Sequence, residues 1–476
     1  MRCIGTELSK ADACGFSSRR GGPWGRATPA VWCARRACSE VRSVPPTATA
    51  TTSRERPVGP LQLLALGVNG IVGVGIFFAP AEVAAQAPGA SAILAFALTG
   101  LALVPVAFAF AVLGRRFDAD GGPVLFARTA FGERTSFLVG WVAYVSAFLS
   151  TSAVVAGLSQ ALAPSLGLAG PWGQRALASV LATVLAGVVA SGIRVSARAW
   201  TALTVLKLLP LAALLVAFAV LSGPAPVQVV ASGTTDTAWL RAGLTVMFAY
   251  QGFEIVPVIA GQVRSSSRSV PLATVGSLLV AVLLYVGLVW ACVAALPALA
   301  SSPAPLAASA GVWGGATLEK WVAAGTSISA LGICLGMMVT TPRYLSALAS
   351  GERTLLGLDG MSPAGVPMRA LAVTWALVVL FVNLGNLSEL FALSSIAVLM
   401  QYGVTAAALA ALAFRKERGL TPLHAVLAVP TLALGLTLVA YGATRNEAAT
   451  TALTVMAGLV LLRLAKPRAS AGAADT

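Results

Sequence analysis

About twelve apolar stretches, each close to the roughly 20 residues that a helix needs to cross a hydrocarbon core, follow one another along the chain. The composition agrees, because 57% hydrophobic and 10% charged residues, with a mean hydropathy of +0.85, leave too little polar surface to cover a soluble protein of 476 residues. The sequence therefore predicts an all-α integral membrane protein. The expected spans are residues 61–81, 90–113, 135–162, 176–193, 200–221, 240–262, 273–296, 321–345, 370–384, 390–414, 423–441 and 449–464.

The positions of lysine and arginine predict the orientation in the membrane. After residue 56, and with Lys207 set aside, the basic residues on one side are Arg175, Arg241, Lys320 and Arg445, and all the others fall on the side that carries both termini. The positive-inside rule assigns that second side to the cytoplasm. We expect a multi-pass protein of the plasma (inner) membrane. The net charge of +15 then reflects topology and attraction to anionic lipid, and no nucleic-acid partner is expected.

Residues 1–56 differ in kind from the remainder. They are basic, carry Cys3, Cys14, Cys33 and Cys38, and end in a Thr/Ala/Pro-rich run without hydrophobic periodicity. We expect a disordered cytoplasmic tail there, a membrane domain over 57–468 and a short cytoplasmic tail over 469–476. The cysteine spacings do not match paired zinc-binding arms, and no metal or cofactor is expected.

Glycines interrupt the first span at Gly67, Gly70, Gly73 and Gly75. A helix broken there exposes backbone N–H groups at membrane depth, which is tolerated only where protein or a bound group satisfies them. The pattern therefore predicts a buried site for a small anionic group, and hence transport.

The sixth span contains the second polar interruption, where Gly252 and Pro257 flank Glu254. Proline removes a donor and clashes with the preceding turn, so the helix is weakened on both sides of the carboxylate. An ionisable group costs about 2.5 kcal/mol or more at the bilayer centre, which indicates a functional residue. The alternative is that Glu254 only accepts hydrogen bonds from the unwound part of the first span. Lys207, the other charge well inside a span, either takes part in transport or extends toward the cytoplasmic headgroups.

Several motifs together give the chain a resemblance to a known family. They are Gly73-Val-Gly75-Ile-Phe77, the loop with Gly121-Gly122 and Phe131-Gly132, Gly192-Ile-Arg194 leading to Lys207, Phe248-Ala-Tyr-Gln-Gly252-Phe-Glu254, and Arg268-Ser-Val-Pro271. In this order and spacing they resemble the amino acid, polyamine and organocation (APC) superfamily of amino acid permeases over residues 60–420.

The resemblance implies the leucine-transporter-like fold with broken first and sixth helices. Residues 61–221 and 240–414 would form two inverted five-helix repeats, and 423–464 two accessory helices. The two interrupted spans occupy the same place in each half, which agrees with this arrangement. The implied activity is that of a secondary active transporter, not an enzyme, moving an amino acid or related amine by alternating access.

The resemblance also implies where the substrate binds. Its carboxylate would meet the N–H groups of Val72, Gly73, Val74, Gly75 and Ile76, and its ammonium the carbonyls of Phe248, Ala249, Tyr250, Gln251 and Gly252. Helix ends supply partial positive charge at one break and partial negative charge at the other, so an amino acid zwitterion fits both. The ring of Phe248 would cover the substrate. A single acid in the site favours a neutral amino acid over a diamine.

Coupling is expected to use a proton, as symport, antiport or exchange. Lys207 matches the lysine of proton-coupled relatives, whose amine lies where sodium lies in sodium-coupled ones, and Glu254 is the second candidate. The alternative is Na⁺ held by hydroxyl oxygens of Thr326, Ser327 and Ser329.

Two other function classes stay open from the sequence. An integral membrane enzyme of lipid-linked group transfer would need converging acids, a metal cluster or a nucleophile with its base. The chain offers only His424 and the pair Asp118 and Asp120, which is typical of a turn. A transporter-like sensor would bind the substrate without moving it.

Overall fold

The computed structural model describes residues 59–73, 75–117, 121–192, 197–222, 236–349, 353–354, 357–363, 365–417, 419–464 and 466–467. The chain divides into residues 1–55 and 56–476, and everything described belongs to the second unit. Both expected tails, 1–56 and 469–476, lie outside the described residues.

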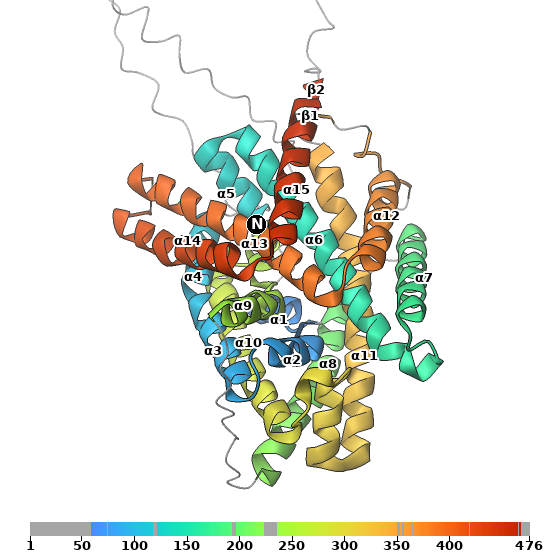
Figure 1. Ribbon diagram of the computed structural model, residues 1–476. Coiled ribbons are helices and arrows are strands. Elements are labelled where there is room, and N and C mark those ends of the chain that lie inside the picture. The colour runs from blue at the N-terminus through green and yellow to red at the C-terminus, as the bar shows by residue number, and fades with distance from the viewer. Residues whose placement is uncertain are drawn as a thin grey trace, which may run out of the picture. The chain divides into compact units, whose positions relative to one another are not determined.

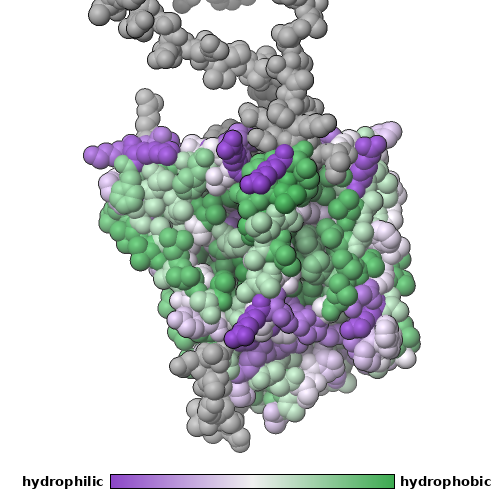
Figure 2. Space-filling model, turned by 45° about the horizontal axis from the view of Figure 1, so that its top comes forward, coloured by the Kyte–Doolittle hydropathy of each residue, from purple (hydrophilic) through white to green (hydrophobic). Residues whose placement is uncertain are grey.

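Helices occupy every expected span of the described unit, which confirms the all-α membrane architecture. Nine of its helical segments are long and apolar enough to cross a membrane, and shorter apolar helices cover residues 205–221 and 368–384. The sixth expected span, residues 240–262, consists of an α-helix followed by a 3₁₀ helix. An apolar belt lies between two polar bands on the surface (Figure 2).

The first half of the unit contains α1 (Pro60–Ile71), α2 (Gly75–Gln86), α3 (Ala90–Ala102), α4 (Val104–Arg116), α5 (Gly122–Phe131), α6 (Glu133–Leu162), η2 (Pro164–Leu166), α7 (Pro171–Ala190) and α8 (Ala197–Leu221). The second half contains α9 (Asp236–Tyr250), η3 (Phe253–Gln262), α10 (Ser266–Ala295), η4 (Leu299–Ser301), α11 (Pro305–Ala349), α12 (Met368–Leu384) and α13 (Leu387–Phe414). After it come η5 (Pro422–Leu427), α14 (Ala428–Thr437), η6 (Leu438–Gly442) and α15 (Arg445–Leu464). A two-residue strand, β1 (Arg353–Thr354), pairs antiparallel with β2 (Lys466–Pro467).

Several elements differ from the expected ones, and local sequence accounts for most of them. The loop expected after the second span contains a helix, α5, which starts with Gly122 and Pro123 in its first turn. That span itself divides at Leu103, because Pro105 sits in the first turn of α4. α11 begins before the expected residue 321, since it joins two helices across a kink at Gly315, whose φ is +70°.

Burial separates central helices from peripheral ones. In the most apolar part of each span, 78% of α6 and 67% of α13 is buried, against 22% of α7 and 11% of α15. In the most apolar part of α1 and α2, 65% is buried, and the ribbon shows α1, α2 and α9 near the middle of the bundle with α7 at its edge (Figure 1). The broken helices therefore lie inside the bundle.

The bundle has two ends that differ in charge. The basic end is where α4 ends at Arg116, where α13 ends just before Arg415, and where α6 begins. There the Arg116 guanidinium pairs with the Glu417 carboxylate at 2.7 Å. The opposite end is where α2 and α6 end and where α9 and α15 begin.

Candidate functional site

The first break separates α1 from α2. Val72 follows α1 with a non-helical ψ of 77°, and its N–H donates to the Val68 carbonyl at 2.7 Å. The N–H of Gly73 donates to the Ile71 carbonyl at 2.6 Å. Both N–H groups are therefore already bonded within the chain. Val74 lies outside the described residues.

Side chains from two other helices satisfy the carbonyl groups that the break exposes. The Lys207 amine, on α8, donates to the Asn69 carbonyl at 2.9 Å and also to the Val72 carbonyl. The Tyr285 hydroxyl, on α10, donates to the Ile71 carbonyl at 2.7 Å. Lys207 is only 3% exposed, so the interpretation that it extends to the headgroups is wrong. A cation at the C-terminal end of α1 also opposes the partial negative charge of that end.

The second break separates α9 from η3. α9 ends at Tyr250, and Gly252 has a φ of +129°, a conformation that favours glycine. One oxygen of the Glu254 carboxylate accepts from the Gly252 N–H at 2.8 Å and from the Tyr402 hydroxyl, on α13, at 3.0 Å. The alternative interpretation had Glu254 accept hydrogen bonds from the first span, but its carboxylate bonds within the second break and to α13.

The two breaks cross in backbone contact. A Cβ added to Gly252 would lie 2.4 Å from the carbonyl oxygen of Gly70, and one added to Gly75 would lie 2.5 Å from the Cα of Ala249. Neither position has room for a methyl group. A Cβ added to Gly73 would instead meet the end of the Ile333 side chain at 3.3 Å.

A cavity of about 400 Å³ lies against this crossing. Among the predicted site residues, the cavity is lined by Gly73, Gly75, Phe248, Gln251, Gly252 and Glu254. The side chains of Val72, Ile76, Ala249 and Tyr250 are buried elsewhere, and the Tyr250 hydroxyl donates to the Phe96 carbonyl at 3.1 Å.

The cavity extends from the breaks toward the basic end and is closed toward the opposite end. It reaches Gly121 and Pro123, which follow α4, and Tyr344 near the end of α11. In the other direction the ring of Phe248 stacks on that of Phe391, with the ring centroids 4.3 Å apart.

Three serines that bond to Gln251 could not be identified from the sequence, and one of them, Ser150, lines the cavity. The Gln251 amide oxygen accepts from the hydroxyls of Ser150, on α6, at 3.3 Å and of Ser394, on α13, at 3.1 Å. Its amide nitrogen donates to the Ser395 hydroxyl at 3.4 Å, which itself donates to the Leu244 carbonyl at 2.8 Å. Gln251 is therefore fixed against two helices. Single serines in apolar helices gave no signal, because most such hydroxyls bond to their own helix.

The three hydroxyl residues considered for sodium are used differently. The Thr326 hydroxyl donates to the Val322 carbonyl at 2.8 Å, and that of Ser327 to the Ala323 carbonyl at 3.2 Å. The Ser329 hydroxyl oxygen is buried without a hydrogen-bond partner among the described residues. Only Ser329 therefore has a hydroxyl that is not engaged by the described part of its own helix.

The residues considered for an enzyme do not form a cluster in the described structure. Within the described ranges no three His, Cys, Asp or Glu side chains come together as they would around a metal ion. The ring nitrogen Nδ1 of His424 accepts from the Thr421 N–H at 3.0 Å, at the start of η5. Asp118 and Asp120 lie outside the described residues.

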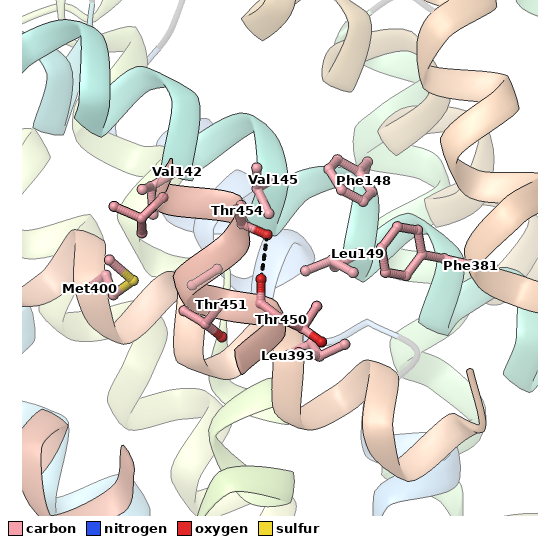
Figure 3. Close-up of a pocket in the computed structure, with 12 residues that line it drawn as sticks. Val142, Val145, Phe148, Leu149, Phe381, Leu393, Met400, Thr450, Thr451 and Thr454 are labelled. Atoms are coloured by element: carbon pink, nitrogen blue, oxygen red, sulfur yellow. Dashed lines mark hydrogen bonds between the residues drawn. The ribbon is translucent and has the colours of Figure 1, made fainter. Parts of the chain in front are cut away.

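A second hollow, between α6, α12, α13 and α15, is too small for a substrate. Its volume of about 20 Å³ has room for one water molecule. Figure 3 shows the rings of Phe148 and Phe381 beside it, and the Thr454 hydroxyl donating to the Thr450 carbonyl. The larger cavity at the crossing is therefore the candidate site.

Comparison with known proteins gives consistent results. The model of a family described as amino acid permease matches residues 58–462. An uncharacterized transporter of Mycobacterium tuberculosis is 28% identical over 390 residues, covering 80% of this chain and 87% of its own. A branched-chain amino acid permease of Lactococcus lactis is 27% identical over 68% of this chain and 74% of its own. Human cationic amino acid transporter 4 is 24% identical over 82% of this chain and 65% of its own.

Proposed function

Because the chain belongs to the amino acid permease family, we propose that it is a secondary active transporter that moves an amino acid through the described cavity by alternating access. The observation that carries this proposal is the cavity of about 400 Å³ at the crossing of the two helix breaks. A polar ligand bound at membrane depth needs backbone N–H and C=O groups that are not used in helical hydrogen bonds, and the two breaks supply such groups.

The substrate carboxylate binds at the start of α2. The N–H groups of Val72 and Gly73 already have acceptors, whereas those of Gly75 and Ile76 belong to a first helical turn, where the helix itself supplies none. Partial positive charge at this terminus favours an anion. Val74, which lies between Gly73 and Gly75 in the sequence, remains part of the proposed carboxylate site.

The substrate ammonium binds at the end of α9, where the carbonyls from Phe248 to Gly252 carry partial negative charge. The hydrogen bonds of Gln251 to the serines hold this end in place. Ala249 and Tyr250 contribute through their backbone, since both side chains are buried.

A neutral amino acid suits the remainder of the cavity. Glu254 is the acidic residue that lines it, and its carboxylate already accepts two hydrogen bonds. The wall beyond the breaks includes Ile333, Met337 and Val398, which suit an apolar side chain. Among the relatives, one is named for branched-chain and others for cationic amino acids, and the cavity favours the first kind.

The coupling ion is a proton, or the transporter works by exchange. Lys207 links a protonatable amine directly to the first break through the Asn69 and Val72 carbonyls. A charged amine has three donors and makes the stronger bonds, so loss of its proton would loosen its hold on the end of α1. Glu254 likewise links a protonatable carboxylate to the second break, through the Gly252 N–H. Sodium is the second candidate, because the Ser329 hydroxyl has no partner in the described part of the chain.

The positive-inside rule assigns the basic end to the cytoplasm. The protein then lies in the plasma membrane with both termini inside, and the described cavity faces the cytoplasm. In the proposed 5+5 inverted repeat, the two halves can exchange conformations, and the cavity would then open toward the opposite end.

Purified protein in proteoliposomes tests the proposal. Counterflow of labelled neutral amino acids should occur, and an imposed pH gradient, with or without Na⁺, should drive uptake. Lys207→Met removes the proton and both hydrogen bonds, so gradient-driven uptake should be lost. Lys207→Arg keeps the charge and the donors but cannot release a proton at ordinary pH, so it should retain exchange alone.

Three results would count against parts of this account. Absence of counterflow for every amino acid and amine would reject transport and leave the sensor alternative. Gradient-driven uptake by Lys207→Met at the wild-type rate would remove Lys207 from coupling. A requirement for Na⁺ without any effect of the pH gradient would replace the proton by sodium.

A further inference from the structure

An ion pair joins α9 to α15 near the opposite end. The Arg241 guanidinium, on α9, contacts the Glu447 carboxylate, on α15. The side chain of Glu447 is 3% exposed and that of Arg241 18%, so both charges are largely removed from solvent. α15 follows the two predicted repeats, and this contact ties the sixth span to a helix outside them.

The pair is held on both sides by further hydrogen bonds. The same Glu447 oxygen accepts from the Thr444 N–H at 2.8 Å, which fixes it at the start of α15. The Arg241 guanidinium also donates to the Ser388 hydroxyl, on α13, at 3.4 Å. On the α2 side, the half-buried carboxylate of Glu82 is attracted to Arg241. Arg241 is therefore paired with one carboxylate, on α15, and attracts a second one, on α2.

α9 packs closely against η6. A Cβ added to Gly442, in η6, would lie 2.8 Å from the Leu240 carbonyl oxygen. A Cβ added to Gly243 would meet the Leu438 side chain, also in η6, at 2.9 Å. α9 therefore has room to move away from η6 but not closer to it.

The same helix carries the ring that closes the cavity. Phe248 follows Arg241 by seven residues, or about two helical turns, so the two side chains lie on one face of α9. Phe248 stacks on Phe391 of α13, next to the cavity. A movement of the whole of α9 away from α13 and α15 would break both this stacking and the contact between Arg241 and Glu447.

We propose that the Arg241–Glu447 pair positions α9 over the cavity and must separate for the cavity to open toward the opposite end. This inference rests on the proposed alternating access. It makes an accessory helix part of the closing device, since α15 supplies the carboxylate that holds α9 in the described conformation.

The test measures from which face of the membrane a reagent in solution reaches the cavity. Ala147, on α6, lines the cavity, and Ala147→Cys in a chain with its six cysteines replaced by alanine gives one reporter thiol. A charged, membrane-impermeant thiol reagent is added from one face of oriented proteoliposomes at a time. Arg241→Gln and Glu447→Gln each break the ion pair, and the exchanged pair Arg241→Glu with Glu447→Arg restores it. Arg175→Gln is the control, because Arg175 is a cation of the same end that lies over the Trp172 ring.

In either single variant, we expect the reporter thiol to react about tenfold faster than in the parent when the reagent is added from the opposite face. A tenfold shift in the equilibrium between the two conformations would produce this change in rate. Labelling from the basic face should stay the same or become slower, and the exchanged pair and Arg175→Gln should resemble the parent. Where Arg241→Gln does not elute as a single species, Glu447→Gln, which keeps an oxygen for the Thr444 N–H, carries the test.

Unchanged labelling from the opposite face in a well-folded Glu447→Gln variant would overturn the proposal. Faster labelling from both faces would also overturn it, since that means general loosening. Failure of this proposal and failure of the proposed function are distinguishable: a parent protein without counterflow would reject transport, whereas unchanged labelling in a variant of a parent that shows counterflow would reject only the role of the ion pair.

Discussion

Replacement of Gly252 by alanine should disrupt the crossing of the two breaks more than any other single methyl group added there. The residue has a φ of +129°, in the region that side chains disfavour, and its Cβ would lie 2.4 Å from both the carbonyl carbon and the oxygen of Gly70. The overlap is with backbone of the other break, which cannot turn away as a side chain can. The two breaks must therefore separate, or the second one must change its conformation.

The magnitude follows from these two effects. A non-glycine residue in a sparsely populated backbone region costs about 1–3 kcal/mol. Overpacking by one methyl group typically costs about 1–3 kcal/mol more. The free energy of unfolding should therefore fall by about 2–6 kcal/mol, a large part of the 5–15 kcal/mol typical of a domain. For Gly73→Ala, whose Cβ meets only the flexible end of Ile333 at 3.3 Å, the cost should stay below about 1.5 kcal/mol.

Thermal unfolding of both purified variants, together with uptake into proteoliposomes, measures the difference. Gly252→Ala should lower Tm by roughly 3 °C or more and abolish uptake, while Gly73→Ala should lower Tm by less than half as much and keep measurable uptake. Equal losses in the two variants would show that the breaks do not rely on close backbone contact. Normal uptake by Gly252→Ala would refute the described crossing as the functional geometry.

Two further substitutions separate packing from charge at the site. Gly75→Ala should reduce uptake by at least about tenfold, because its Cβ would lie 2.5 Å from the Cα of Ala249. A strain of about 1.4 kcal/mol is enough for that factor. Uptake near the wild-type rate would mean that α2 and α9 can separate freely. Glu254→Gln keeps an oxygen for the Gly252 N–H and the Tyr402 hydroxyl, so substrate affinity should change by less than about tenfold while the pH profile of uptake flattens. An unchanged profile would make Glu254 a structural hydrogen-bonding group.

The architecture and the positions of the breaks could be predicted because they depend on signals that are local in sequence. Span length follows from the thickness of the hydrocarbon core, and a glycine or proline inside an apolar run is itself the cause of the break. The breaks accordingly lie at glycines of the two interrupted spans: Gly75 is the first residue of α2, and Gly73 and Gly252 follow the ends of α1 and α9. The inverted repeat remains a prediction from the same pattern.

The partners of the polar side chains could not be predicted, because they depend on which helices pack together. Nothing in the residues around Lys207 decides whether its flexible chain turns toward the headgroups or toward the first break. Nothing near Glu254 in the sequence indicates that Tyr402, on α13, supplies one of its donors. Ser150 and Ser394 look like ordinary helix serines until the fold brings them to Gln251.

The cavity also affects how an electrical potential is distributed across the protein. Because the cavity extends from the breaks to the basic end, the layer that separates the two solutions lies between Phe248 and the opposite end. In the proposed cytoplasm-facing state, most of a transmembrane voltage falls across that layer. One elementary charge moved through 100 mV changes its energy by about 2.3 kcal/mol, so Arg241 and Glu447 feel more of the voltage than Lys207 and Glu254 do. Membrane polarisation would thus act mainly on the opposite end of α9, with little direct effect on the breaks that hold the substrate.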